Sequence, residues 1–322
     1  MHFRHAFALT AAAAAFAPVA QASDQVFTHT YLSELNPVGS LEVEQQTTYR
    51  TRKSQGVYDL VQSRTELEYG ITSRWQASLY LNAYSVTARD NNSTASRNNF
   101  TVGPGDGDEV TGGGPATIGS DVPASSTFPI PAARYHQAGF ESISVENIVQ
   151  FASPYKDGYG LAGYVELTGG ARTREVEFKL LGQKNLLEDD LILAANLAVE
   201  FERENWTRLG FEREAEVTLS GGASYRVANG WRLGLEMRNE RAWEGSYSLS
   251  GSHRDYSAWF AGPTVQYAGS AGGHGLFLTG GWSQQLPWAE AWSAASRVEL
   301  VGGRVYKESE RNVFKLIAGV SF

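Results

Sequence analysis

The sequence contains no cysteine and, after residue 22, no apolar run as long as a membrane-spanning helix. The lack of cysteine excludes disulfides and Cys-ligated metal sites, and it suits an oxidising envelope compartment. Without about 20 consecutive apolar residues, no helix of this chain is expected to cross a bilayer. Basic residues are also scarce, with 27 Lys and Arg against 35 Asp and Glu and a net charge of −8. This acidic balance argues against a nucleic-acid partner.

Residues 1–22 have the composition of a secretory signal peptide. Arg4 provides the positive start, residues 6–20 form the apolar run, and Ala20-Gln21-Ala22 is a small-x-small cleavage site. The run is shorter than a spanning helix and contains Pro18. We expect residues 23–38 to form an N-terminal tract in the periplasm, in which His29 is solvated.

Strand-like segments fill the rest of the chain, and convincing helices are absent. Most segments alternate with period two: Leu191, Leu193 and Leu197 share one face, opposite Asn196 and Glu200. Mean hydropathy is only −0.31, which fits strands with one lipid face and one wet face. The segments, each long enough to cross a membrane as a tilted strand, are 39–52, 57–70, 74–87, 139–152, 158–169, 174–184, 190–203, 213–226, 231–242, 256–268, 273–285 and 311–322.

The last segment, Arg311 to Phe322, ends the chain on an exposed apolar face. Phe314, Leu316 and Phe322 lie on that face, and from Phe314 on Ile317 is the one apolar residue on the other. This ending resembles the closing strand of bacterial outer-membrane β-barrels. The resemblance implies that the terminal aromatic is read by the barrel assembly machinery.

The connections between the segments alternate between two classes. The gaps on one side are tight turns, and the longest gaps, 88–138, 243–255 and 286–310, fall on the other side. Bacterial barrels show the same asymmetry between periplasmic turns and extracellular loops. Aromatic residues at the periplasmic ends of the lipid faces would form an interfacial girdle: Tyr69, Trp75, Tyr225, Trp231, Tyr267 and Phe322.

These patterns predict one domain, residues 39–322, that forms an all-β, transmembrane antiparallel up-and-down barrel of about 12 strands in the bacterial outer membrane. Residues 286–310 leave the count open, because the strand-like pieces around Gly302-Gly303 suit either a hairpin above the membrane or two more spanning strands. Fourteen and ten strands are the alternatives. A closed barrel has no free edge, so a monomer is expected.

The face opposite the apolar one carries repeated Glu-x-Glu pairs, and period two places both carboxylates of a pair on one side. Charges facing lipid would cost several kcal/mol each, so we expect them to face the lumen. The predicted lumen-lining residues are Glu42, Glu44, Arg50, Arg64, Glu66, Glu68, Tyr80, Tyr84, Glu200, Glu202, Glu214, Glu216 and Arg238.

The lumen residues leave two interpretations open. Glu and Arg could pair across strands and fill a narrow lumen with ion pairs, or surplus carboxylates could line a pore that prefers cations. Tyr80 and Tyr84 could offer a rail for an aromatic or sugar-like solute, or simply fill space.

The long extracellular loop 88–138 is rich in Gly, Pro, Ser and Asn, and it could fold into the mouth as a constriction or remain a surface loop. Its acidic run Gly105-Asp106-Gly107-Asp108-Glu109 lacks EF-hand spacing, so no metal site and no cofactor are predicted.

A catalytic site is the weakest interpretation. Ser252-His253-Arg254-Asp255 holds the residue types of a hydrolase triad, but adjacent residues of a strand point apart and triads are assembled from distant segments. We expect no enzyme, with a barrel hydrolase, dependent on His253 or His136, as the weaker alternative.

The stretch from Gly39 to Asn82 contains a charged E-x-E strand followed by R-x-E-x-E-Y-G-I-T-x-R-x-Q-x-S-L-Y. It resembles uncharacterised proteobacterial barrels related to the family named for a putative phenol-degradation (MetA) pathway. The resemblance implies an outer-membrane protein sometimes described as a transporter, and it identifies no solute-binding residue. The sequence thus predicts a channel for passive passage of an unidentified small solute, with a closed barrel that is structural or binds a partner through its loops as the runner-up.

The closing strand generates a first prediction. Replacing Phe322 by Ser should lower the amount of barrel in the outer membrane, because the terminal aromatic that the assembly machinery reads is lost. Immunoblots of outer-membrane fractions measure this amount. Wild-type levels of the variant would contradict the role assigned to the C-terminal residue.

Overall fold

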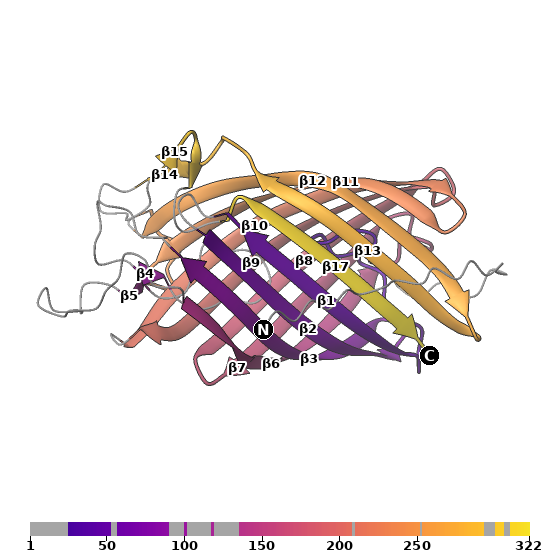
Figure 1. Ribbon diagram of the computed structural model, residues 1–322. Coiled ribbons are helices and arrows are strands. Elements are labelled where there is room, and N and C mark those ends of the chain that lie inside the picture. The colour runs from indigo at the N-terminus through magenta and orange to yellow at the C-terminus, as the bar shows by residue number, and fades with distance from the viewer. Residues whose placement is uncertain are drawn as a thin grey trace, which may run out of the picture.

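The chain folds into a closed β-barrel whose strands lie oblique to its long axis (Figure 1). The computed structural model describes residues 25–52, 57–89, 100–101, 117–118, 135–207, 210–251, 253–292, 300–305 and 310–322. Twelve long strands build the wall: β1 (Leu41–Thr51), β2 (Val57–Thr72), β3 (Trp75–Arg89), β6 (Tyr135–Ala152), β7 (Gly160–Gly170), β8 (Thr173–Leu186), β9 (Leu191–Thr207), β10 (Gly210–Ala228), β11 (Trp231–Glu244), β12 (Arg254–Ala271), β13 (His274–Gln285) and β17 (Asn312–Ser321). Over these ranges, no helix is long and apolar enough to cross a membrane.

Each long strand pairs antiparallel with its neighbours in the chain, and the first strand pairs with the last. In Figure 1 the indigo β1 lies beside the yellow β17. At this seam the backbone nitrogen of Phe322 donates a 2.8 Å hydrogen bond to the oxygen of Leu41. The predicted up-and-down barrel of twelve strands is therefore confirmed.

The period-two pattern separates an outer apolar face from an inner polar one. Leu79, Leu197 and Leu316 are exposed on the outside, whereas Glu and Gln side chains at alternating positions are buried. Ile317, the residue that broke the alternation, is fully buried on the inner face. The predicted girdle lies on the outer face, where the rings of Trp231 and Tyr267 are 4.9 Å apart. This outer band of apolar side chains is the surface that an outer-membrane barrel presents to lipid.

Within the described residues of the segment 286–310, no further strand spans the wall. β14 (Glu290–Ala291) pairs with β12, and β15 (Leu300–Val301) and β16 (Arg304–Val305) form a small hairpin. Gly302 and Gly303 make its turn with φ of 61° and 72°, a conformation that glycine adopts without strain. Of the loop 88–138, only its ends and the short pair β4 (Phe100–Thr101) and β5 (Thr117–Ile118) lie within the described residues. The proposed constriction, the acidic run 105–109 and the signal peptide lie outside them.

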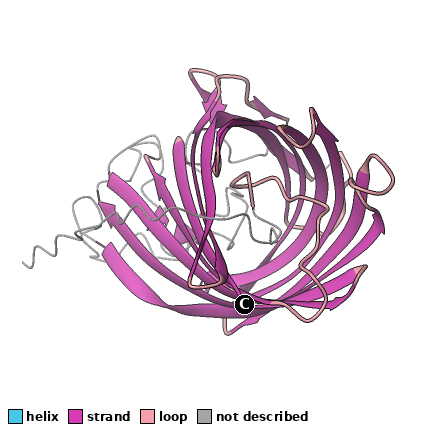
Figure 2. Ribbon diagram, turned by 90° about the vertical axis from the view of Figure 1, so that its right-hand side faces the viewer, coloured by secondary structure: helices cyan, strands magenta, loops and turns pink. Residues whose placement is uncertain are grey.

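The N-terminal tract differs from the expectation. Residues 25–36, which we call the lumenal segment, lie inside the barrel, and Figure 2 shows loop chain within the ring of strands. His29 was expected to be solvated, and this is wrong, because only 3% of its surface is exposed. Its neighbours Phe27 and Thr30 are buried as well. The reason is that the segment is held by polar side chains of the inner wall, described next.

Candidate functional site

The carboxylate of Glu236, on β11, holds the lumenal segment through consecutive backbone groups. Its Oε2 accepts hydrogen bonds from the nitrogen and Oγ1 of Thr28, at 3.1 and 2.7 Å, and its Oε1 accepts from the nitrogens of His29, at 2.8 Å, and of Thr30. Hydrogen bonds to an ionised acceptor contribute more than neutral ones. Glu236 is therefore the main polar anchor of the segment.

The rest of the segment follows the inner wall from strand to strand. Tyr31 exchanges two hydrogen bonds with Asn196 on β9, donated by its nitrogen (2.7 Å) and accepted by its oxygen (3.1 Å). Ser33 donates from its nitrogen to Gln183 on β8 (3.0 Å), and Asn36 donates from its nitrogen to Gln76 on β3 (2.8 Å). These partners lie in the half of the barrel near the short turns, so the segment occupies the periplasmic half of the lumen.

Two glycines of the wall give the segment its space. A Cβ on Gly222 would lie 2.5 Å from the ring of Phe27, and a Cβ on Gly70 would lie 2.7 Å from the backbone oxygen of Asn36. Real Cβ atoms do not approach other atoms this closely. The wall is thus shaped to fit the segment as closely as a protein core fits its side chains.

Aromatic and cationic groups fix the middle of the segment. The rings of Tyr31 and Tyr164 meet edge to face with centroids 5.4 Å apart, and Lys179 Nζ lies 4.2 Å from the centroid of Tyr31. Burial, and next the positive charge of Arg238, hold the pKa of His29 well below its ordinary value, so its imidazole is neutral at pH 7. At the periplasmic turn, Tyr155 donates to Glu34 (2.9 Å), and burial followed by this carboxylate raises the pKa of Tyr155.

Above and beside the segment, the strand register aligns seven glutamates and one serine into one row. Each member lies directly opposite the next on the neighbouring strand, across eight consecutive strands of the wall. We call it the glutamate row: Glu42, Glu68, Ser78, Glu146, Glu166, Glu177, Glu200 and Glu216. All eight are buried.

The glutamate row climbs through the barrel. The line through directly opposed residues is perpendicular to the strands. Because the strands of such barrels are tilted, this line rises along the barrel axis. Glu68 lies near the periplasmic end of β2, whereas Glu216 lies in the extracellular half of β10. The row therefore extends from the periplasmic part of the lumen toward its extracellular mouth.

Basic side chains balance part of this charge. Arg64 Nη2 contacts both oxygens of Glu166, at 3.0 and 3.1 Å, and Lys179 Nζ lies 3.1 Å from Glu177 Oε2. Arg238 pairs with Glu240 at 2.5 Å. Beside Arg64 and Glu166 is a cavity large enough for about one water molecule. Buried side chains of the inner wall and the lumenal segment thus occupy this part of the lumen.

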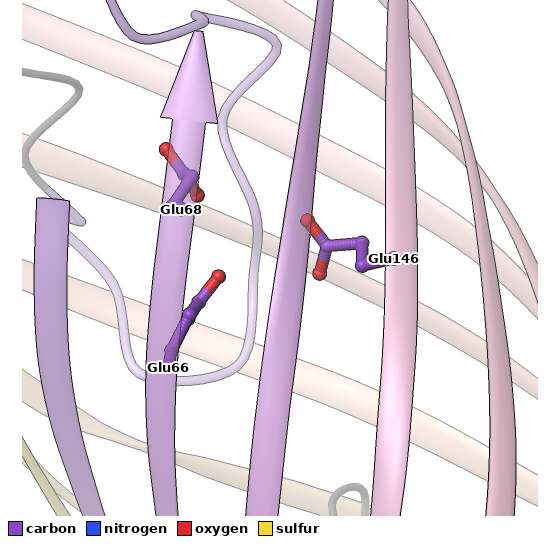
Figure 3. Close-up of side chains that lie close together, drawn as sticks. All are labelled: Glu66, Glu68 and Glu146. Atoms are coloured by element: carbon purple, nitrogen blue, oxygen red, sulfur yellow. The ribbon is translucent and has the colours of Figure 1, made fainter. Parts of the chain in front are cut away.

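Three carboxylates of the inner wall come within reach of one ion. Oxygens of Glu66, Glu68 and Glu146 lie within 4.8 Å of one another, with two residues on β2 and the third on β6 (Figure 3). Tyr80 donates to Glu146, and Asn36 of the lumenal segment donates to Glu68. Among the described residues, these three glutamates are the group with the spacing to hold a metal ion.

The predicted lumen-lining residues all lie in the wall with the inward phase. Twelve of the thirteen are buried, and Glu214 is half-buried. Tyr80 is fully enclosed beneath the guanidinium of Arg64, 4.0 Å from its ring centroid, and Tyr84 packs with Tyr58 and Leu60. Both positions agree with space filling.

Two features of the site were not predicted. The Glu-x-Glu pairs revealed the inward face, but not that the strand register aligns them into one row. The sequence holds only a weak signal of the lumenal segment. Gln76, Gln183 and Asn196 are amides at inward positions, and the alternating pattern by itself does not show what they bind.

The histidines that follow the signal region are spread over different elements. His29 is in the lumenal segment. His136, on β6, lies with its Nδ1 3.0 Å from Oγ1 of Thr87 on β3. His274 packs on Phe322 with ring centroids 4.9 Å apart. Ser252 lies outside the described residues, and His253 is exposed in the β11–β12 connection. The described histidines therefore form no shared site with one another.

Comparisons with known proteins agree with this architecture. A family model described as "Family of unknown function (DUF6662)" matches residues 19–322. No curated protein matches the sequence. The COG4313 outer membrane channel from Pseudomonas putida F1 is similar in structure, with a TM-score of 0.54 and 11% identity over 90% of this chain and 97% of that one. The NanC porin (TM-score 0.44, 11% identity, 87% and 98% covered) and the KdgM porin (0.38, 10%, 87% and 98%) are more distant.

The anchor generates a prediction that the absence of cysteine makes easy to test. In a Thr30→Cys background, Glu236→Ala should speed labelling of the thiol by a water-soluble maleimide at least about tenfold, because charge-assisted hydrogen bonds of about 1.5–3 kcal/mol each are lost. Glu290→Ala, which changes the same charge at an exposed position, is the matched control. Equal labelling rates in both variants would show that Glu236 does not hold the segment.

The ion pair of Arg64 and Glu166 generates another prediction. Arg64→Met should lower the free energy of unfolding by about 3–5 kcal/mol, because it leaves a buried carboxylate without its cation. Arg64→Met/Glu166→Gln should recover most of the loss. Urea unfolding of the refolded barrel, followed by Trp fluorescence, measures both. A single variant as stable as wild type would mean that the pair contributes little.

Proposed function

The chain belongs to the DUF6662 family of unknown function, and we propose that it is an outer-membrane channel for the passive passage of small solutes, with a preference for cations. The observation that carries this proposal is the glutamate row. Like charges placed directly opposite each other destabilise a sheet, so a purely structural wall has no reason to align them. Rings of carboxylates in a pore attract cations and repel anions.

The lumenal segment acts in this proposal as the gate of the channel. The segment lies along the inner wall in the periplasmic half of the lumen, so in this proposal solutes pass when the segment moves. It has the properties of a part that can leave: it has no strand pairing and is held by side-chain hydrogen bonds to Glu236, Asn196, Gln183 and Gln76. Segments held by few backbone hydrogen bonds open at lower free-energy cost than strands.

A closed barrel is the second candidate. The buried inner side chains and the buried lumenal segment favour it, because a filled interior stabilises a wall without any transport. In that case the barrel would support the envelope or bind a partner through its extracellular loops. We prefer the channel because aligned carboxylates lower the stability of the wall, and a closed barrel would gain nothing from them.

The resemblance to barrels related to the MetA-pathway family remains part of the proposal, and we do not extend it to phenol. The inner wall between β1 and β3 is lined by carboxylates and amides, which suit cations or small polar solutes better than an apolar ring.

Conductance of the refolded barrel in a planar bilayer tests the proposal. We expect low or intermittent current from the wild type and a larger, steady current from Glu236→Ala and from a variant that lacks residues 25–36. Under a salt gradient, the reversal potential should show preference for the cation. Glu146→Gln/Glu200→Gln should move it toward zero, because two carboxylates of the row lose their charge.

Glu290→Gln is the matched control, since it removes one exposed carboxylate outside the lumen. Silence from every variant, in samples shown to be folded by their heat-dependent migration in gels, would favour the closed barrel. If the current is steady and the Glu146 and Glu200 replacements leave the reversal potential unchanged, the protein is a channel but the glutamate row does not set its ion preference.

A further inference from the structure

Three arginines form a row on the outer surface of adjacent strands. Arg174 on β8 lies directly opposite Arg203 on β9, and Arg203 lies directly opposite Arg213 on β10. Side chains at directly opposed positions have Cβ atoms about 5 Å apart. We call these three residues the arginine row.

The arginine row faces outward, away from the lumen. On β8, Arg174 shares its face with the exposed Phe178 and Leu180, and it alternates with the buried Glu177. Arg203 alternates with the buried Glu202 on β9, and Arg213 with Glu214 and the buried Glu216 on β10. Arg174 and Arg213 are exposed, and Arg203 is half-buried.

The row lies toward the extracellular end of the wall. The three residues lie at the ends of their strands that are far from the periplasmic turns, above the apolar residues Phe178, Leu197 and Leu219 of the same outer face. The upper edge of the apolar band is where the headgroups of the outer leaflet begin. A lipid headgroup is therefore the nearest partner from outside the protein.

The chemistry of the row fits a phosphate. Like charges directly opposite each other are destabilising unless an anion lies between them. This fit rests on the two exposed members, Arg174 and Arg213: among the residues that the structure describes, neither has a carboxylate within ion-pair distance, and Arg213 lies 5.6 Å from the ring centroid of Tyr247. The planar guanidinium fork matches phosphate oxygens better than an ammonium does.

We propose that the arginine row binds the phosphate groups of a phosphorylated lipid in the outer leaflet, the lipid A class of glycolipid. A diphosphorylated headgroup would bridge the exposed guanidinium groups of Arg174 and Arg213, with Arg203 between them. The apolar side chains below the row would contact its acyl chains. This surface lies on the outside of β8 to β10 and is independent of the proposed channel.

Binding of purified lipid A to the refolded barrel in detergent tests the proposal. The triple variant Arg174→Gln/Arg203→Gln/Arg213→Gln should bind lipid A with a Kd raised on the order of a hundredfold. The reason is that each basic group near an anionic lipid surface contributes about 1 kcal/mol. The same substitution by Lys at all three positions keeps the charge but loses the fork, and it should give an intermediate Kd. Arg74→Gln, in the periplasmic β2–β3 turn, is the control for the loss of one charge and should leave the Kd unchanged.

Two further ligands separate the sources of binding. Dephosphorylated lipid A should bind the wild type as weakly as lipid A binds the Gln variant, and inorganic phosphate should compete poorly because it lacks acyl chains. A Gln variant that folds and binds lipid A like wild type would overturn the proposal. So would equal binding of the dephosphorylated lipid, or full competition by inorganic phosphate, which would assign the row to a free ion.

Discussion

The structure depends on one constraint, that no backbone N–H or C=O can be left without a hydrogen bond inside a bilayer. A sheet meets it only by closing on itself, and the pairing of β1 with β17 is that closure. Closure then fixes two faces with period two. The outer face carries Leu, Val and aromatic residues, and carboxylates such as Glu66 and Glu146 are directed inward.

Directing charges inward concentrates them in a small volume, and the lumen shows how the fold handles this. Arg64, Lys179 and Arg238 pair with neighbouring carboxylates, while the lumenal segment supplies backbone N–H donors to Glu236 and the amide of Asn36 to Glu68. The segment is therefore both a filler and an electrostatic partner of the wall. The same balance suggests why it can serve as a gate, since its contacts are side-chain hydrogen bonds rather than strand pairing.

Much of this followed from the residues alone. Alternation located the twelve strands within a few residues of their ends, because a strand with one lipid face has an unambiguous pattern. The same pattern directed Glu66, Arg64 and Tyr80 inward. The placement of His29 failed, because residues 25–36 have no periodic pattern, and their burial depends on Glu236, some 200 residues away in the sequence.

The sequence by itself determined the barrel, its two faces and the residues of each, since these depend only on local period and on the cost of charge in lipid. Only the tertiary structure decided which residues meet. The glutamate row and the arginine row exist because the register of each strand pair aligns residues from distant parts of the chain. Register is set by turn geometry and by the packing of both faces together, so no single strand contains it.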